Sequence, residues 1–136
     1  MKGSYKLSKV FLGGTCNEST WRDDLIENLK IDYFNPVVPD WTPECMAEEI
    51  KQRETCDFVL YTITPKMTGV YSIAEVIDDS NKRPEKTLFC LLDEDDGEHF
   101  TAGQWRSLKQ VLEMVKRNGG RTFISLYSVS EYLNRH

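Results

Sequence analysis

The stretch from Cys56 to Asp79 constrains the fold more than any other part of the chain. It opens with a short run of β-branched and aromatic side chains, FVLYTI, which is typical of a strand buried on both faces of a parallel sheet. Pro65 and Gly69 then interrupt the run, because proline lacks a backbone donor and glycine accepts unusual dihedral angles. After Gly69, apolar residues recur at intervals of three and four, the period of one helix face. The sequence therefore predicts a strand, a loop and a helix in succession.

Glu75 lies in the first turns of this predicted helix. In open parallel sheets, ligands bind beyond the carboxyl ends of the strands, where loops lead into helix N-termini, so we expect Glu75 near a binding crevice. One alternative interpretation is structural, because Ser72 and Glu75 have the spacing of a capping box. Another is a solvated position on the helix surface. The residues by themselves leave these interpretations open.

The rest of the chain repeats this alternation of strand and helix. Apolar runs predict five strands, near residues 9–12, 33–38, 58–63, 87–92 and 122–126. Amphipathic or capped segments predict helices after Thr20, after Thr42 and Pro43, after Gly69, over residues 105–115 and at residues 130–133. Such alternation predicts an α/β fold, a doubly wound three-layer sandwich with a five-stranded parallel sheet in the flavodoxin-like order 2-1-3-4-5. The length of 136 residues fits a single domain spanning residues 1–136.

In this strand order the switch point lies between the first and third strands. It places the Gly13-Gly14-Thr15 turn and the segment from Thr64 to Glu75 on opposite sides of one crevice. Two adjacent glycines let a ligand approach the backbone closely, and the helix N-terminus that follows favours an anion. A plain tight turn is an equally good interpretation, because the full G-x-G-x-x-G fingerprint is missing.

Asp40 and Trp41 precede the second predicted helix. A carboxylate beside an aromatic ring at the carboxyl end of a strand can bind a heterocycle or a sugar hydroxyl. The alternative is that Asp40 turns the chain and Trp41 packs on a neighbour. We predict that Met46, Ala47 and Ile50 form the apolar face of the helix. Its charged residues are expected to face water, namely Glu44, Glu48, Glu49, Lys51 and Arg53.

Composition excludes several classes of function. A net charge of −5 argues against binding to a nucleic acid polymer, and no apolar stretch approaches the ~20 residues of a membrane span. The acidic segment from Asp93 to Glu98 lacks the EF-hand pattern, so a solvated loop is favoured over a calcium site. The cysteines show no C-x-x-C spacing, so we expect no metal site. Free thiols and an N-terminal apolar stretch too short for a secretory signal indicate a cytoplasmic protein.

Three segments are similar to a known family: VFLGGTCNESTWRD near the start, YFNPVVPDWTPE next, and MTGVYSIAEV in the middle. With them the chain resembles the short branch of the nucleoside 2-deoxyribosyltransferase-like family. The resemblance implies an enzyme that cleaves the N-glycosidic bond of a (deoxy)nucleoside or nucleotide and transfers the sugar to another base or to water. It implies that Glu75 is the nucleophile, that no cofactor is needed and that the partner is a small nucleoside or nucleotide.

Further residue roles follow from this resemblance. Asp40 is the candidate for orienting the base or supplying a proton, and Tyr71 is the candidate for holding Glu75 or a sugar hydroxyl. The glycine turn would bind a 5′-hydroxyl or 5′-phosphate through its backbone N–H groups. The residues expected to bind substrate are Gly13, Gly14, Thr15, Trp41, Met67, Thr68 and Gly69.

The chain departs from the family pattern at three positions. The glutamate usually follows a loop of the form D-x-G-T-x-x-E-[LI]-G, and here the loop aspartate and the last glycine are missing. Phe11 or Leu12 replaces the usual tyrosine of the first strand. These departures support an alternative function, a non-catalytic module that binds or senses a nucleotide-like ligand in the same crevice. The family also implies a homo-oligomer, with Trp105 or residues 127–132 as interface or, equally, as aromatic core.

Overall fold

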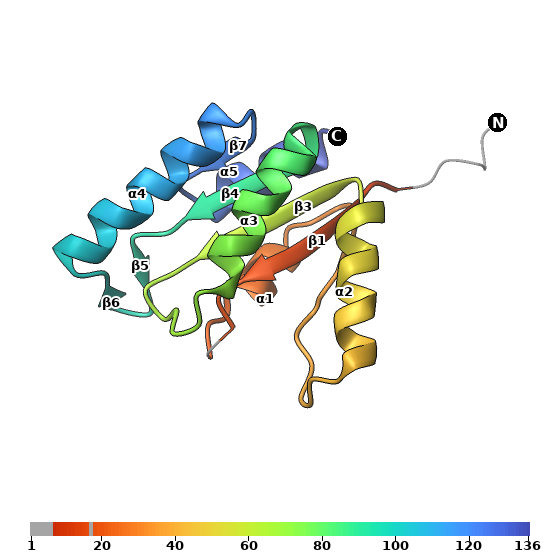
Figure 1. Cartoon of the computed structure of the whole chain (residues 1–136), viewed down its shortest axis with the longest axis horizontal. Coiled ribbons are helices and arrows are strands. Elements are labelled where there is room, and N and C mark those ends of the chain that lie inside the picture. The colour runs from red at the N-terminus through yellow and green to blue at the C-terminus, as the bar shows by residue number, and fades with distance from the viewer. Residues whose placement is uncertain (1–6, 17) are drawn as a thin grey trace.

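The computed structural model describes residues 7–16 and 18–136 of the chain. Its centre is a parallel sheet in the order β2-β1-β3-β4-β7 (Figure 1). The five strands are β1 Lys9–Gly14, β2 Asp32–Phe34, β3 Phe58–Ile63, β4 Thr87–Leu91 and β7 Arg121–Phe123. Strands β5 (Glu94–Asp95) and β6 (Glu98–His99) form a separate antiparallel hairpin. Counted along the chain, the main strands follow the order 2-1-3-4-5, so the predicted flavodoxin-like α/β fold is confirmed.

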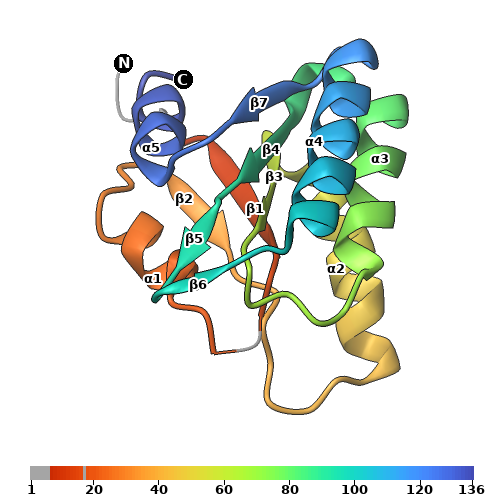
Figure 2. The same cartoon turned by 90° about the vertical axis from the view of Figure 1, so that its left-hand side faces the viewer.

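Helices cover both faces of the sheet (Figure 2). One face carries α1 (Trp21–Ile26) and α5 (Leu126–Asn134). The other carries α2 (Pro43–Thr55), α3 (Tyr71–Lys82) and α4 (Ala102–Arg117), and the short 3₁₀ turn η1 (Pro84–Lys86) precedes β4. The central strand β3 contributes to the core on both faces of the sheet. Tyr61 packs under α3 and α4, and Leu60 packs under α1 and α5. The apolar run that predicted this strand is therefore buried on both sides.

Helix α2 begins as predicted but packs differently from the other helices. Thr42 caps it, since its hydroxyl accepts a hydrogen bond from the Cys45 N–H at 3.2 Å, and Pro43 occupies the first helical position. None of its residues is buried, and the apolar Met46 and Ile50 remain 41% and 48% exposed. The predicted apolar face thus does not pack into the core. It stands away from the sheet and leaves a space between them.

Two local predictions were wrong. The second strand ends at Phe34 rather than continuing to residue 38, because Pro36 cannot donate to the ladder; it lies at the sheet edge as expected. The acidic segment expected to be a loop forms the β5-β6 hairpin. Asp96 and Gly97 turn it with φ of 54° and 84°, the left-handed conformations that a tight hairpin turn of the Asp-Gly type needs.

The aromatic residues considered for an interface mostly pack within the chain. Trp105 stacks on Phe100 with ring centroids 5.9 Å apart, and Tyr132 contacts the ring of Phe123 at 5.7 Å. Tyr127, by contrast, is 74% exposed. Within the described ranges no helix is long and apolar enough to cross a bilayer. The expectation about the N-terminal segment falls partly on residues 1–6, which lie outside the described residues.

Candidate active site

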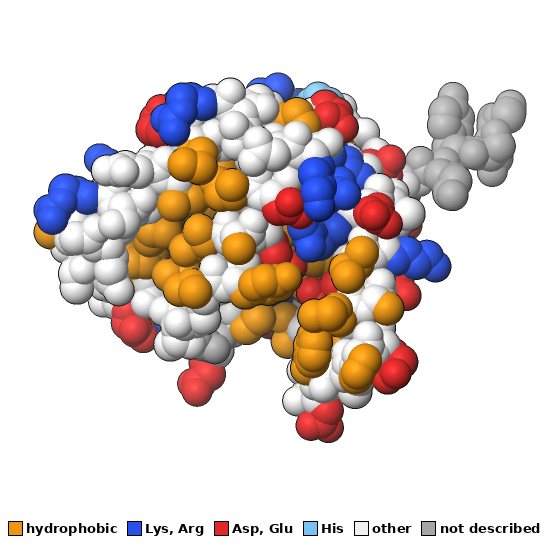
Figure 3. All heavy atoms as spheres, in the orientation of Figure 1, with side chains coloured by type: hydrophobic (Ala, Val, Ile, Leu, Met, Phe, Trp, Pro, Cys, Tyr) orange, Lys and Arg blue, Asp and Glu red, His pale blue; other side chains and the backbone are white. Residues whose placement is uncertain are grey.

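A cavity of about 630 Å³, which we call the main cavity, lies between α2 and α3 at the carboxyl end of β1. It occupies the space that α2 leaves beside the sheet. Figure 3 shows hydrophobic side chains on both sides of this part of the surface. The lining residues are Phe11, Gly13, Gly14, Cys16, Arg22, Pro36, Val37, Val38, Trp41, Met46, Glu49, Ile50, Arg53, Tyr71, Ser72 and Glu75.

Glu75 borders the main cavity from the second turn of α3 and is only 9% exposed. It does not close a capping box, because α3 has Val70 as its N-cap and makes no side-chain capping bond there. Nor is it a solvated residue of the helix surface. Both structural interpretations of this glutamate are therefore wrong, and a buried carboxyl group faces a cavity.

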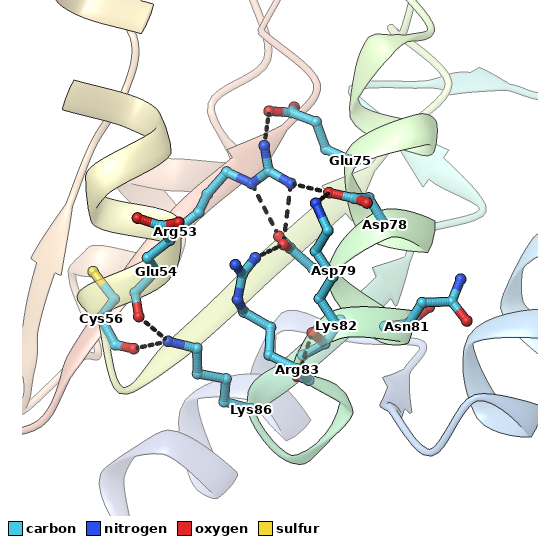
Figure 4. A network of polar contacts seen from close by, with 12 residues as sticks. Arg53, Glu54, Cys56, Glu75, Asp78, Asp79, Asn81, Lys82, Arg83 and Lys86 are labelled. Atoms are coloured by element: carbon cyan, nitrogen blue, oxygen red, sulfur yellow. Dashed lines mark hydrogen bonds and ion pairs between the residues drawn. The ribbon is translucent and has the colours of Figure 1, made fainter. Parts of the chain in front are cut away.

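Arg53 holds the Glu75 carboxylate (Figure 4). Its Nη1 lies 3.5 Å from Oε2 of Glu75, and its Nη2 lies 3.1 Å from Oδ2 of Asp78. The guanidinium also donates two hydrogen bonds to Asp79, from Nε to Oδ2 at 3.1 Å and from Nη2 to Oδ1 at 3.0 Å. We predicted that Arg53 faces water, and this prediction is wrong, because its side chain is only 11% exposed.

Asp79 anchors this network from the core. It is fully buried, and the Tyr61 hydroxyl donates a hydrogen bond to its Oδ2 at 2.6 Å. Arg83 pairs with its other oxygen. Burial works against the charged guanidinium of Arg53, but the hydrogen bond to Asp79 and the surrounding negative charges outweigh burial and raise its pKa. Arg53 is therefore a permanent cation with a fixed position beside Glu75.

Burial raises the pKa of Glu75 from 4.5 to about 7. The charge of Arg53 opposes this shift, whereas the charges of Glu49 and Asp79 add to it. A carboxyl group that titrates near neutrality inside a cavity is typical of catalytic sites.

The glycine turn forms the wall next to Glu75. Gly14 has φ of +120°, and a Cβ built on it would lie 2.0 Å from the carbonyl oxygen of Thr62. The Thr15 N–H donates to that same carbonyl at 2.9 Å, and the Thr15 hydroxyl accepts from the N–H of Thr64 at 3.0 Å. The end of β1 and the loop after β3 are thus joined, as the predicted switch point requires.

Arg22 stabilises the glycine turn through hydrogen bonds to backbone carbonyl groups. Its guanidinium donates to the carbonyl oxygens of Leu12, Gly14 and Thr15 at 2.9, 3.2 and 2.6 Å. The side chain is buried and also lines the main cavity. Within the described part of the chain no carboxylate forms an ion pair with Arg22, and its three hydrogen bonds to backbone go to these carbonyl oxygens.

A smaller cavity of about 250 Å³ adjoins the main one, with which it shares Gly14, Cys16, Tyr71 and Ser72. We call it the side cavity. The loop after β3 lines it through three of the predicted binding residues, Met67, Thr68 and Gly69, and Thr15 lines it from β1. Tyr71, 67% exposed, stands between the two cavities.

The structure thus brings together nine of the ten residues singled out in the sequence and leaves one apart. Gly13, Trp41 and Glu75 line the main cavity, and the others line the side cavity or both. Asp40, the exception, is exposed in the loop before α2 and lines neither cavity. The reason is that the loop presents Trp41 rather than Asp40 to the cavity.

Most of the chain matches a known protein family. The family model described as nucleoside 2-deoxyribosyltransferase like matches residues 7–93, more than half of the chain. The chain belongs to this family. Its members are associated with glycosyl transfer and nucleoside binding, and the matched segment holds every residue that lines the two cavities. A comparison with curated proteins gives no match.

This family member has three charged cavity residues that were not among the predicted site residues, namely Arg22, Glu49 and Arg53. The spacing of residues along α2 could have indicated two of them. Glu49 and Arg53 recur with Met46 and Ile50 on one helix face, at intervals of three and four. No comparable signal marked Arg22, since its partners are backbone carbonyls.

Proposed function

We propose that the protein cleaves the N-glycosidic bond of a (deoxy)nucleoside or nucleotide, with Glu75 as the nucleophile, and passes the sugar to another base or to water. One observation carries the proposal: Glu75 is buried, paired with Arg53 and nevertheless borders an open cavity. The volume of about 630 Å³ lies within the range of small-molecule sites.

The chemistry requires a carboxylate next to the anomeric carbon. As the glycosidic bond breaks, the sugar acquires oxocarbenium character, which a nearby negative charge stabilises and can trap as a glycosyl ester. Arg53 keeps the Glu75 carboxylate in one orientation, so that the second oxygen is available for attack. Attack by another base on the ester gives transfer, and attack by water gives hydrolysis.

A 5′-phosphate on the substrate is favoured by the charge of Arg22. This guanidinium lies behind the glycine turn and lines the main cavity, and no described carboxylate forms an ion pair with it. Since a buried cation is stabilised by a nearby anion, a phosphate in the cavity would complete the pairing. We therefore expect deoxynucleotides to be better substrates than the corresponding deoxynucleosides.

To test this proposal, the protein is incubated with a panel of deoxynucleosides and deoxynucleotides, and the released free base is measured by chromatography. We expect release by the wild type and a loss of at least about 10³-fold in Glu75→Gln, because the nucleophile is removed. Glu54→Gln removes the same charge from an exposed position on α2 outside both cavities and serves as the control. Unchanged release in Glu75→Gln would refute the proposal.

A second candidate function is a non-catalytic nucleotide-binding module. It is favoured by the Arg53 network, since the same ion pair would hold Glu75 in a purely structural role. Calorimetry that shows micromolar binding of a deoxynucleotide, together with no base release, would support this candidate. A sugar covalently attached to Glu75, detected by peptide mass spectrometry after incubation with a slowly hydrolysed 2-fluoro nucleoside, would exclude it.

A further inference from the structure

The main cavity contains a second carboxyl group, that of Glu49, to which the proposed function gives no role. Glu49 lies in the middle of α2 and is partly buried. Among the described residues that line the main cavity, Glu49 and Glu75 are the only acids. They come from neighbouring helices on the same side of the sheet (Figure 1).

Glu49 belongs to a wall of the cavity that is otherwise mostly apolar. Trp41 from the preceding loop and Met46 and Ile50 from α2 provide the apolar and aromatic surface of this wall. A flat heterocycle binds well between such side chains when a polar group meets its edge. Glu49 supplies a polar group there. This wall therefore has the chemistry of a nucleobase site.

Arg53 fixes the position of this wall relative to Glu75. Glu49 and Arg53 are one helical turn apart on α2, which places their Cβ atoms about 5–6 Å from each other. The guanidinium of Arg53 in turn lies 3.5 Å from the Glu75 carboxylate. A sugar whose anomeric carbon faces Glu75 can therefore direct its base toward Glu49, while its 5′ end points to the glycine turn.

We propose that Glu49 contacts the leaving base and donates a proton to one of its ring nitrogens as the glycosidic bond breaks. This inference rests on the proposed function. In this role Glu49 replaces Asp40, which lines neither cavity, as the candidate proton donor.

Cleavage couples bond formation at the sugar to proton transfer to the base. A carboxylate oxygen of Glu75 forms a bond to the anomeric carbon, and the electron pair of the carbon–nitrogen bond goes to the base. The proton of the Glu49 carboxyl group moves to a ring nitrogen, so that the base leaves neutral and Glu49 becomes a carboxylate. In the second half, Glu49 takes a proton from water or from the acceptor base as that nucleophile displaces Glu75 from the sugar.

Burial raises the pKa of Glu49 and so favours the proton that the proposed step requires, whereas the Trp41 side chain and the charges of Arg53 and Arg22 oppose the shift. Glu75 on α3 is the remaining charged group that lines the cavity, and the charge of Glu49 raises the pKa of Glu75. A bound base would remove more water from Glu49 and favour its neutral form further.

The decisive experiment varies the leaving group. The natural deoxynucleotide needs a proton on its base, whereas para-nitrophenyl 2-deoxyriboside releases a stable phenolate without one. We expect Glu49→Gln to lower kcat/KM for the deoxynucleotide by about 10²- to 10⁴-fold and to leave cleavage of the nitrophenyl substrate nearly unchanged. Glu75→Gln should abolish both reactions, because both need the nucleophile.

Glu54→Gln on the same helix is the matched control, and circular dichroism verifies that each variant is folded. Equal slowing of both substrates in Glu49→Gln, or no slowing of either, would overturn the role of Glu49 while leaving that of Glu75 intact. If the wild type cleaves neither substrate, the proposed function fails and this inference fails with it.

Discussion

Arg53 on α2 and Glu75 on α3 form an ion pair, with Nη1 and Oε2 3.5 Å apart, at the inner edge of the main cavity. The remaining guanidinium nitrogens of Arg53 bind Asp78 and Asp79. The side chain that holds the candidate nucleophile is therefore itself held by two further carboxylates. Such a chain of contacts restricts the rotamers of Glu75 before any ligand arrives.

Removing the Tyr61 hydroxyl should destabilise the network of Arg53 and its acidic partners. Tyr61→Phe deletes the 2.6 Å hydrogen bond to the buried Asp79, which keeps its pairs with Arg53 and Arg83. We expect the free energy of unfolding to fall by about 1–3 kcal/mol, measured by urea denaturation under reducing conditions. Tyr33→Phe, at a 43% exposed position on β2, is the control and should change stability little. Equal stability of the two variants would show that the bond contributes nothing.

Replacing Glu75 should remove a loss of stability that the wild type undergoes as the pH rises. Folding raises the pKa of Glu75 from 4.5 to about 7, so the folded state binds this proton more tightly than the unfolded state. The resulting stability is fully present below the unfolded pKa and is lost as the pH rises through about 7. Between about pH 5 and pH 8, the unfolding free energy of the wild type should fall by roughly 2–3 kcal/mol relative to Glu75→Gln. Parallel pH profiles for the two proteins would contradict this.

The same titration should appear in the reaction rate. Attack on the sugar requires the Glu75 carboxylate, which predominates only above its pKa of about 7. With the nitrophenyl substrate, which needs no proton from Glu49, we expect kcat/KM to rise about tenfold for each pH unit below that value and to level off above it. A flat profile over this range would mean that Glu75 does not titrate in the reaction.

The glycine turn should tolerate no side chain at its second position. A Cβ on Gly14 would meet the Thr62 carbonyl oxygen at 2.0 Å, and its φ of +120° is strained for any other residue. We expect Gly14→Ala to destabilise the fold by more than about 4 kcal/mol. Gly69→Ala, where a Cβ meets nothing within 4 Å, is the matched comparison and should fold normally. Thermal unfolding by circular dichroism measures both, and a normally folded Gly14→Ala would contradict the expectation.

The strand order was predictable because each buried strand is a continuous apolar run and each crossover has a helical period. The switch-point rule predicted Glu75 near a crevice, although its capping-box spacing also suited a structural role. These features depend on local patterns and on topology, both of which a single sequence contains.

Helix α2 shows where sequence patterns were insufficient. Its apolar residues were expected to form one face and its charged residues to face water, a pattern that suits a helix lying directly on a sheet. Because α2 stands away from the sheet, Met46 and Ile50 line a cavity, and Arg53 reaches across it to acids of α3. The distance between two elements depends on packing of the whole chain, and periodicity carries no information about it.

Every side chain that lines the two cavities comes before Val76, whereas β4, α4, β7 and α5 contribute to the core and to neither cavity. The cavity lining is thus encoded in the first part of the gene, together with part of the core, whereas these four later elements serve the core. Mutational drift in β4, α4, β7 and α5 would be limited mainly by packing, and libraries aimed at a new leaving group need randomise only positions before Val76.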